Sequence, residues 1–239
     1  MNSSVRRHIV LSAKEKLDLL VTSIVIGIIV FFFYWSRTPY DFASGLGAAA
    51  LIILCSFLVM TLFVGVGKYL ALRRAYKALY YRWNTGLMIG LGLGFISQGI
   101  IPMVFPGFIE LERIKRLAHG ETYTGENRAD IFYVLARTLW VLMLAAMFFL
   151  FLVQQTGFLV FEYFTVIISL ICIFSVLPLR SNIGIHLFYV ARKKYYILAI
   201  MSVVFGILTL IGLFYALIIA AILGLILGTL AKRNVIETG

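Results

Sequence analysis

The chain has 239 residues, of which 62% are hydrophobic and 13% are charged, and its mean hydropathy is +1.03. This composition excludes a soluble globular domain, because it offers too little polar surface to cover one, and it predicts an integral membrane protein. A net charge of +11 invites a nucleic-acid interpretation, but the basic residues cluster at the ends of apolar runs and no nucleic-acid-binding motif is present. The charge pattern therefore predicts the lipid bilayer as a partner and not nucleic acid.

The first two predicted spans lie within residues 19–66, after a segment of residues 1–17. The apolar runs 19–35 and 42–66 are each about as long as the roughly 20 residues that a helix needs to cross a bilayer. Because positive residues favour the cytosolic side, the segments before the first run and after the second are both predicted to be cytosolic. Their basic residues are Arg6, Arg7, Lys14, Lys16, Lys68, Arg73, Arg74, Lys77 and Arg82.

Residues 68–108 combine this basic loop with a glycine-rich apolar segment, residues 86–105. If that segment crossed the membrane, the basic residues that follow it would lie outside, whereas a segment that dips in and returns keeps them cytosolic. A re-entrant or hairpin segment is therefore predicted, with a glycine-rich packed span as the alternative. The residues that make a continuous helix unfavourable are Gly86, Gly90, Gly92, Gly94, Gly99, Pro102 and Pro106.

The polar residues 110–130 are predicted to form a cytosolic loop. In the stretch ELERIKRLA, Leu111, Ile114 and Leu117 would lie on one face of a helix, and Glu112 would pair with Arg116 one turn later. These features predict a short helix on the membrane surface. A charged connector with no further role is the alternative.

Two more spans are predicted within residues 131–179 and a last pair within residues 195–231. The last stretch would be about 55 Å long as one helix, so it must fold back, and the turn is predicted around Gly212. The chain is thus predicted to be a single all-α membrane domain, residues 1–239. It would contain about six transmembrane helices and the re-entrant segment, with both termini in the cytosol.

Arg137 is a charged residue within the third predicted span, about 9 Å from its cytosolic end. A charge at that depth either extends its side chain back to the interface or marks a partner. The candidate partners are Asp130 and Glu126 of this chain and an acidic residue of a neighbouring chain.

Three stretches, taken in chain order, carry a family resemblance: GKYLALRRAYKALYYRWNTGL from Gly67, GFISQGIIPMVFPGFIEL from Gly94 and FSVLPLRSNIGIHLF from Phe174. The chain resembles the site-2 protease family, the intramembrane zinc metalloproteases, and within it the archaeal branch. In that branch the second span ends in HExxH followed by a similar tail, the glycine-rich segment closes in an Ala-Pro-Gly turn, and a Leu-Pro stretch leads into Leu-Asp-Gly. The resemblance implies a site-2-protease-like core in an archaeal plasma membrane.

The departures from that family fall on the residues of its chemistry. Carried over residue by residue, the resemblance puts the two metal-binding histidines at Phe63 and Gly67, the catalytic glutamate at Val64, and the third metal ligand, an aspartate, at Ile183. Zinc-dependent proteolysis needs two imidazoles at i and i+4, a carboxylate ligand and a separate carboxylate base. None of the four side chains present supplies these groups, so no metal, cofactor or catalysis is expected here.

Two alternative functions remain open. A displaced metal site would have to use His8, His119 or His186, none of which is paired with another ligand at the usual spacing. An active metalloprotease built on them is one alternative. A transporter is the other, although the sequence shows no convincing internal repeat.

The favoured prediction is a pseudoprotease, a scaffold or subunit that holds a membrane-protein partner in the groove retained from the protease core. An extended partner segment would add to the edge of the hairpin by backbone hydrogen bonds, which depend little on side-chain identity. Gly90, Gly92 and Gly94 would allow the partner backbone to approach closely, and Arg137 would contribute an ion pair.

Overall fold

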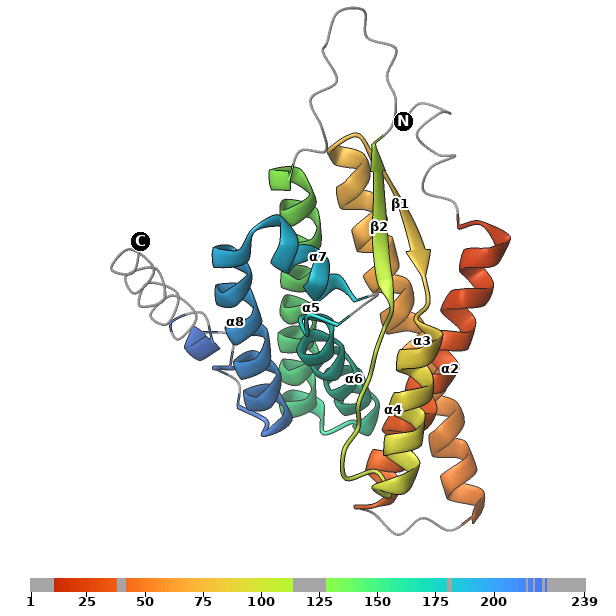
Figure 1. Cartoon of the computed structure of the whole chain (residues 1–239). Helices are drawn as coiled ribbons and strands as arrows, with labels where there is room; N and C mark the ends of the chain where they lie inside the picture. The colour runs from red at the N-terminus through yellow and green to blue at the C-terminus, as the bar shows by residue number, and fades with distance from the viewer. Residues whose placement is uncertain are drawn as a thin grey trace, which may run out of the picture.

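The computed structural model describes residues 11–37, 42–113, 128–179, 182–213, 215–216, 218–220 and 222. This part of the chain is mostly helical (Figure 1). Four of its helices are long and apolar enough to cross a membrane, which confirms the predicted helical membrane protein at this level. They are α2 (Ala13–Trp35), α3 (Phe42–Arg73), α5 (Arg128–Thr156) and α8 (Arg192–Leu210).

Two further apolar helices are shorter. The predicted fourth span contains α6 (Leu159–Ser175), whose 17 residues extend over about 26 Å. Helix α8 ends at Leu210, two residues before Gly212, and most of the predicted sixth span lies outside the described residues. A short helix, α7 (Ile183–Val190), precedes α8.

Helix α2 begins six residues before the predicted first span because of a capping box at its start. The Ser12 hydroxyl accepts a hydrogen bond from the Glu15 backbone N–H at 3.2 Å, and the Glu15 carboxylate accepts one from the Ser12 N–H at 2.8 Å. These two bonds satisfy backbone groups that have no partner inside the helix. As a result, Glu15 and Asp18 belong to the same helix as the apolar span.

A two-stranded antiparallel sheet corrects the prediction that the chain is entirely α-helical. Strand β1 (Tyr76–Tyr81) pairs with β2 (Phe108–Arg113), with Tyr76 opposite Arg113 and Tyr81 opposite Phe108. In both strands every second side chain is buried, which is the period of a strand packed on one face. The buried side chains are Tyr76, Ala78, Tyr80, Ile109 and Leu111.

The prediction of a surface helix beginning at Glu110 is wrong for its first four residues, because Glu110–Arg113 belong to β2. Glu112 lies directly opposite Lys77 in the sheet register, and the two side chains form an ion pair at 3.8 Å. Among the described residues, the cation that pairs with Glu112 is therefore Lys77 on the neighbouring strand. The predicted partner Arg116 lies outside the described residues.

Residues 82–107 connect the two strands as a hairpin. Helix α4 (Asn84–Ile96) leads away from β1 for 13 residues, or about 20 Å, and an irregular segment returns to β2. The turn between them depends on Gly99, which has φ +84° and whose Cβ, if present, would collide with the Phe32 carbonyl of α2. Because Tyr81 pairs with Phe108, both ends of the hairpin lie at the same place (Figure 1).

The described helices pack around one apolar core. Helix α3 contacts α2, α5 and α6, and α6 also contacts α8. Figure 1 shows α2, α3 and α4 on one side of the molecule, α5, α6 and α8 on the other, and the sheet lying over α3. Both strands contact α3, and the Ile109 side chain of β2 lies against Gly67, one of the predicted lost catalytic positions.

Candidate functional site

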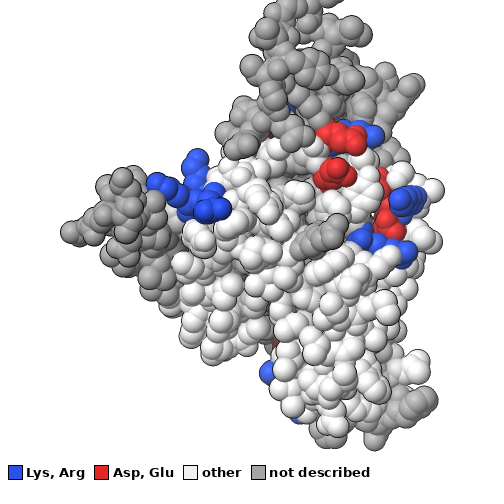
Figure 2. All heavy atoms as spheres, in the orientation of Figure 1, with Lys and Arg blue, Asp and Glu red and all other residues white. Residues whose placement is uncertain are grey.

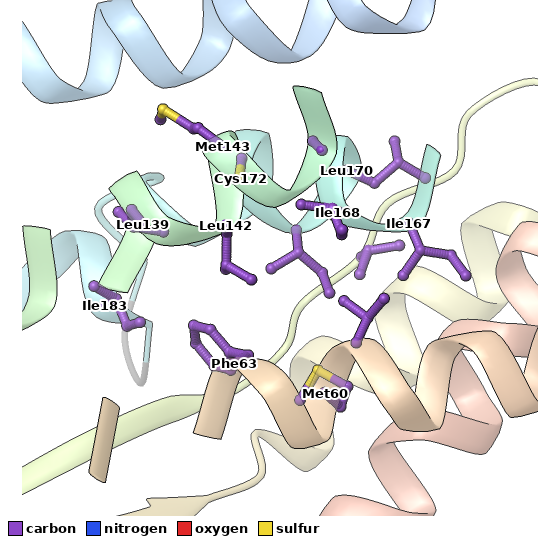
Figure 3. Packing of buried hydrophobic residues seen from close by; sticks show 14 of the residues in the cluster. Met60, Phe63, Leu139, Leu142, Met143, Ile167, Ile168, Leu170, Cys172 and Ile183 are labelled. Carbon is purple, nitrogen blue, oxygen red and sulfur yellow. The ribbon is translucent and has the colours of Figure 1, made fainter. Parts of the chain in front are cut away.

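The positions that the family resemblance assigns to zinc chemistry lie in the apolar core. Phe63 and Val64 of α3 are 0% and 1% exposed, and Ile183, the first residue of α7, is 0% exposed. All three belong to one cluster of buried hydrophobic residues. Figure 3 shows Phe63 and Ile183 in the same region of that core, close to Leu139 and Leu142 of α5. The fold brings two distant segments together here, but their side chains are purely hydrocarbon.

The space beside Gly67, where the resemblance assigns the family's second histidine, is occupied by a side chain of the sheet. A Cβ added at Gly67 would lie 2.5 Å from the Cδ1 atom of Ile109, a buried residue of β2. The Ile109 side chain therefore fills the space into which a ligand at residue 67 would project. Phe63, Val64, Gly67 and Ile183 contain no nitrogen, oxygen or sulfur donor in their side chains, so these residues do not fit a zinc ion.

The histidines considered for a displaced metal site are not assembled into one. His186 lies on α7, and its ring stacks on the Phe108 ring of β2 with centroids 5.8 Å apart. His8 and His119 lie outside the described residues. In the part of the chain that the structure describes, no three His, Cys, Asp or Glu side chains come together as a metal-binding group.

The three glycines predicted to bind a partner have different surroundings. A Cβ at Gly90 would collide with the Met103 carbonyl oxygen, so the close backbone approach at this residue is made by the hairpin's own return segment. A Cβ at Gly94 would contact Ile29 of α2 at an ordinary 3.7 Å, and one at Gly92 would meet nothing within 4 Å. Of the three, only Gly92 faces open space.

Arg137 contacts an aromatic residue one turn earlier on α5. Its guanidinium donates a hydrogen bond to the Tyr133 hydroxyl and lies 5.3 Å from the centre of the Tyr133 ring. Asp130, one of its two predicted partners within the chain, instead pairs with Arg74 at 3.0 Å. The other predicted partner, Glu126, lies outside the described residues.

Sequence reasoning missed a buried ion pair between α2 and α3. The Lys68 ammonium lies 2.7 Å from the Glu15 carboxylate, and the two side chains are only 4% and 6% exposed. The same carboxylate accepts a hydrogen bond from the Tyr80 backbone N–H at 3.0 Å. Glu15 therefore links α2 to both α3 and the outer edge of β1.

A second set of polar contacts holds the base of the hairpin. Asp18 is 5% exposed and pairs with Arg82 at 3.0 Å, just after β1. The Tyr80 hydroxyl donates to the Pro106 carbonyl at 2.6 Å and lies 3.0 Å from the Thr22 hydroxyl. Burial raises the pKa of Tyr80, so its phenol stays protonated and remains a hydrogen-bond donor.

One sequence signal for this network was present. Glu15 and Asp18 are three residues apart at the start of an apolar helix, which puts both carboxylates on one helix face.

No protein-family model, curated protein or solved structure matches this chain. The likeness to site-2 proteases therefore rests on the sequence motifs alone.

Proposed function

We propose that this protein is a catalytically inactive, site-2-protease-like scaffold or subunit that holds a membrane-protein partner along the free edge of β2. Two features support the proposal. The positions that the resemblance assigns to the zinc site are filled by packed apolar side chains. Within the described residues, the outer edge of β2, which passes beside Gly67, has no neighbouring strand. The single observation that carries the proposal is this edge, because it can bind a partner without any catalytic side chain.

The free edge follows from the hydrogen-bonding pattern of the sheet. Residues of an antiparallel strand alternate between those bonded to the neighbouring strand and those whose N–H and C=O groups point away from it. Tyr80 donates its N–H outward to Glu15, so its opposite residue, Ile109, directs its own backbone groups to the outer edge of β2. The same holds for Leu111, which lies opposite Ala78.

No third strand continues the sheet within the described ranges. An extended segment of a partner can pair with such an edge through backbone hydrogen bonds, largely independently of its side chains. The edge passes directly over Gly67, because the Ile109 side chain fills the space beside that glycine. In the proposed function the partner is thus held where a protease of this type would present its substrate, but no group cleaves it.

The membrane topology belongs to the same proposal. Helix α4 is about 20 Å long, shorter than the roughly 30 Å hydrocarbon core, and the chain returns beside its starting point. We place residues 82–107 as a re-entrant hairpin in a plasma membrane, with six spans in all and both termini cytosolic. The topology is tested with a membrane-impermeant thiol reagent on the single-cysteine variants Lys77→Cys and Ser36→Cys, in a background with Cys55 and Cys172 replaced. Reagent added outside intact cells should label Ser36→Cys and not Lys77→Cys, and reagent added to the cytosolic side should give the opposite result.

The scaffold proposal is tested by photo-crosslinking in native membranes. A benzophenone amino acid at Glu110, on the exposed face of β2, should crosslink to one membrane polypeptide. The matched control is the same amino acid at Met88 of α4, which is 76% exposed but far along the chain from the strand edge, and it should not crosslink to that polypeptide.

A proline variant makes the test specific to the strand edge. Leu111→Pro removes an outward N–H and leaves the hydrogen bonds between β1 and β2 intact, so it should abolish the crosslink from Glu110. Equal crosslinking with and without the proline, in a protein that still unfolds cooperatively, would exclude the edge as the binding surface. Zinc at one ion per chain in the purified protein would overturn its assignment as inactive.

A further inference from the structure

A pocket of about 480 Å³ lies between α5 and α8, and none of its lining residues belongs to the sheet or to the positions assigned to zinc chemistry. Its volume is within the usual range for small-ligand sites, about 300–1,000 Å³. Five of its lining residues come from the first half of α5 and one from the start of α8: Phe132, Tyr133, Ala136, Arg137, Trp140 and Lys194.

The pocket has two cations and no described counter-ion. Arg137 and Lys194 come from different helices, and neither forms an ion pair with a carboxylate of the described residues. The nearest acidic residue along α5, Asp130, is already paired with Arg74. The Arg137 guanidinium uses one contact on the Tyr133 hydroxyl, which leaves most of its five N–H donors for a ligand.

The position of the pocket along the helices matches a membrane interface. Arg137 and Lys194 lie in the N-terminal parts of two helices long enough to span a bilayer. Tyr133 and Trp140 flank the cations, and such aromatic residues concentrate where hydrocarbon meets headgroups. Figure 2 shows Lys and Arg gathered on the side of the molecule where α8 begins, with no acidic residue visible beside them on that face.

We propose that this pocket binds the phosphate-bearing headgroup of an anionic phospholipid. The phosphodiester carries a negative charge and two acceptor oxygens, which suit the planar N–H groups of Arg137 and the ammonium of Lys194. Basic pockets between transmembrane helices on the cytoplasmic side bind anionic headgroups in this way. The Lys194 ammonium lies 5.8 Å from the centre of the Phe132 ring, so the apolar face of Trp140 is the surface that would contact the glycerol and the first acyl carbons. This gives Arg137 a role that does not depend on the proposed scaffold function.

The proposal is tested with full-length protein in nanodiscs of phosphatidylcholine that contain a small fraction of fluorescent phosphatidylglycerol. Wild-type protein should bind the anionic lipid saturably. Arg137→Gln and Lys194→Gln should each weaken binding about tenfold or more, since each removes a charge-assisted hydrogen bond. Lys193→Gln is the matched control, because it makes the same charge change on an exposed residue of the same turn outside the pocket.

A third variant and two competition experiments complete the test. Ala136→Phe fills the pocket and leaves every charge in place, so it should also abolish saturable binding. Excess unlabelled phosphatidylglycerol should displace the probe. Inorganic phosphate at about 10 mM should not displace it, because phosphate lacks the acyl chains that contribute to lipid binding. Equal weakening by Lys193→Gln, normal binding by Ala136→Phe, or displacement by inorganic phosphate would each overturn the lipid site.

Discussion

The buried ion pair between Glu15 and Lys68 leads to the sharpest stability prediction. The substitution is Lys68→Met, which keeps a long apolar stem and removes the ammonium. The two side chains are 6% and 4% exposed and 2.7 Å apart, so the Glu15 carboxylate would remain buried without its counter-charge. Removing one partner of a buried pair costs about 3–5 kcal/mol, and we expect the free energy of unfolding to fall by that amount.

The structure offers a matched control in the pair of Lys77 and Glu112. This pair also joins a lysine to a glutamate, but it is 3.8 Å apart and its side chains are 42% and 53% exposed. An exposed pair contributes about 0–1 kcal/mol, so Lys77→Met should change the free energy of unfolding by no more than that. The comparison separates burial from the chemical nature of the pair.

The assay is equilibrium unfolding in mixed micelles of lipid and SDS, followed by circular dichroism. The double variant Glu15→Gln, Lys68→Met should regain at least half of the loss, because a neutral amide oxygen can still accept from the Tyr80 N–H without a buried charge. A Lys68→Met loss no larger than that of Lys77→Met would refute the reasoning. A double variant as unstable as the single one would show that the unpaired carboxylate is not the cause.

Three further predictions concern the turn, the core and pH, each measured by the same unfolding assay. Gly99→Ala should destabilise the protein by about 1–3 kcal/mol because of its positive φ and the collision with the Phe32 carbonyl, whereas Gly92→Ala, with open space beside it, should stabilise helix α4 by up to about 1 kcal/mol. Phe63→Ala should cost about 3–5 kcal/mol, and a loss below 1 kcal/mol would contradict its complete burial. The raised pKa of Tyr80 means that its protonated form is favoured by folding, so its contribution to stability should be complete below about pH 10 and fall above that value, and Tyr80→Phe should remove this part of the pH dependence.

The sequence predicts the long apolar helices because length and composition alone decide whether a segment can cross a bilayer. It does not predict the sheet as easily. The tyrosines of β1 suit a membrane interface as well as a strand, and Glu112 suits a helical pair with Arg116 as well as a cross-strand pair with Lys77. Only the alternating burial of Ile109 and Leu111 distinguishes the two, and that depends on packing against α3.

The candidate site shows the same division between local and long-range information. The resemblance assigns Phe63 and Ile183 to one lost site, and both side chains lie in the same apolar region of the structure, which does not test that assignment. The resemblance could not reveal that the Ile109 side chain fills the space beside Gly67, because this contact depends on how the sheet lies over α3. The partnership of Glu15 with Lys68 was hidden for the same reason, since it requires the relative rotation of two helices.

The buried charged groups are concentrated where the sheet and the hairpin meet α2. A buried ion pair contributes little net stability, because the loss of hydration offsets most of the attraction, but it favours one arrangement of the groups that it joins. Glu15 holds β1 through the Tyr80 N–H, and Asp18 holds Arg82 at the start of the hairpin. The polar interior therefore positions the sheet and the hairpin, whereas the positions that the family resemblance assigns to zinc chemistry are hydrocarbon. The proposed scaffold function, which presents a strand edge, requires the first feature and no zinc ligands.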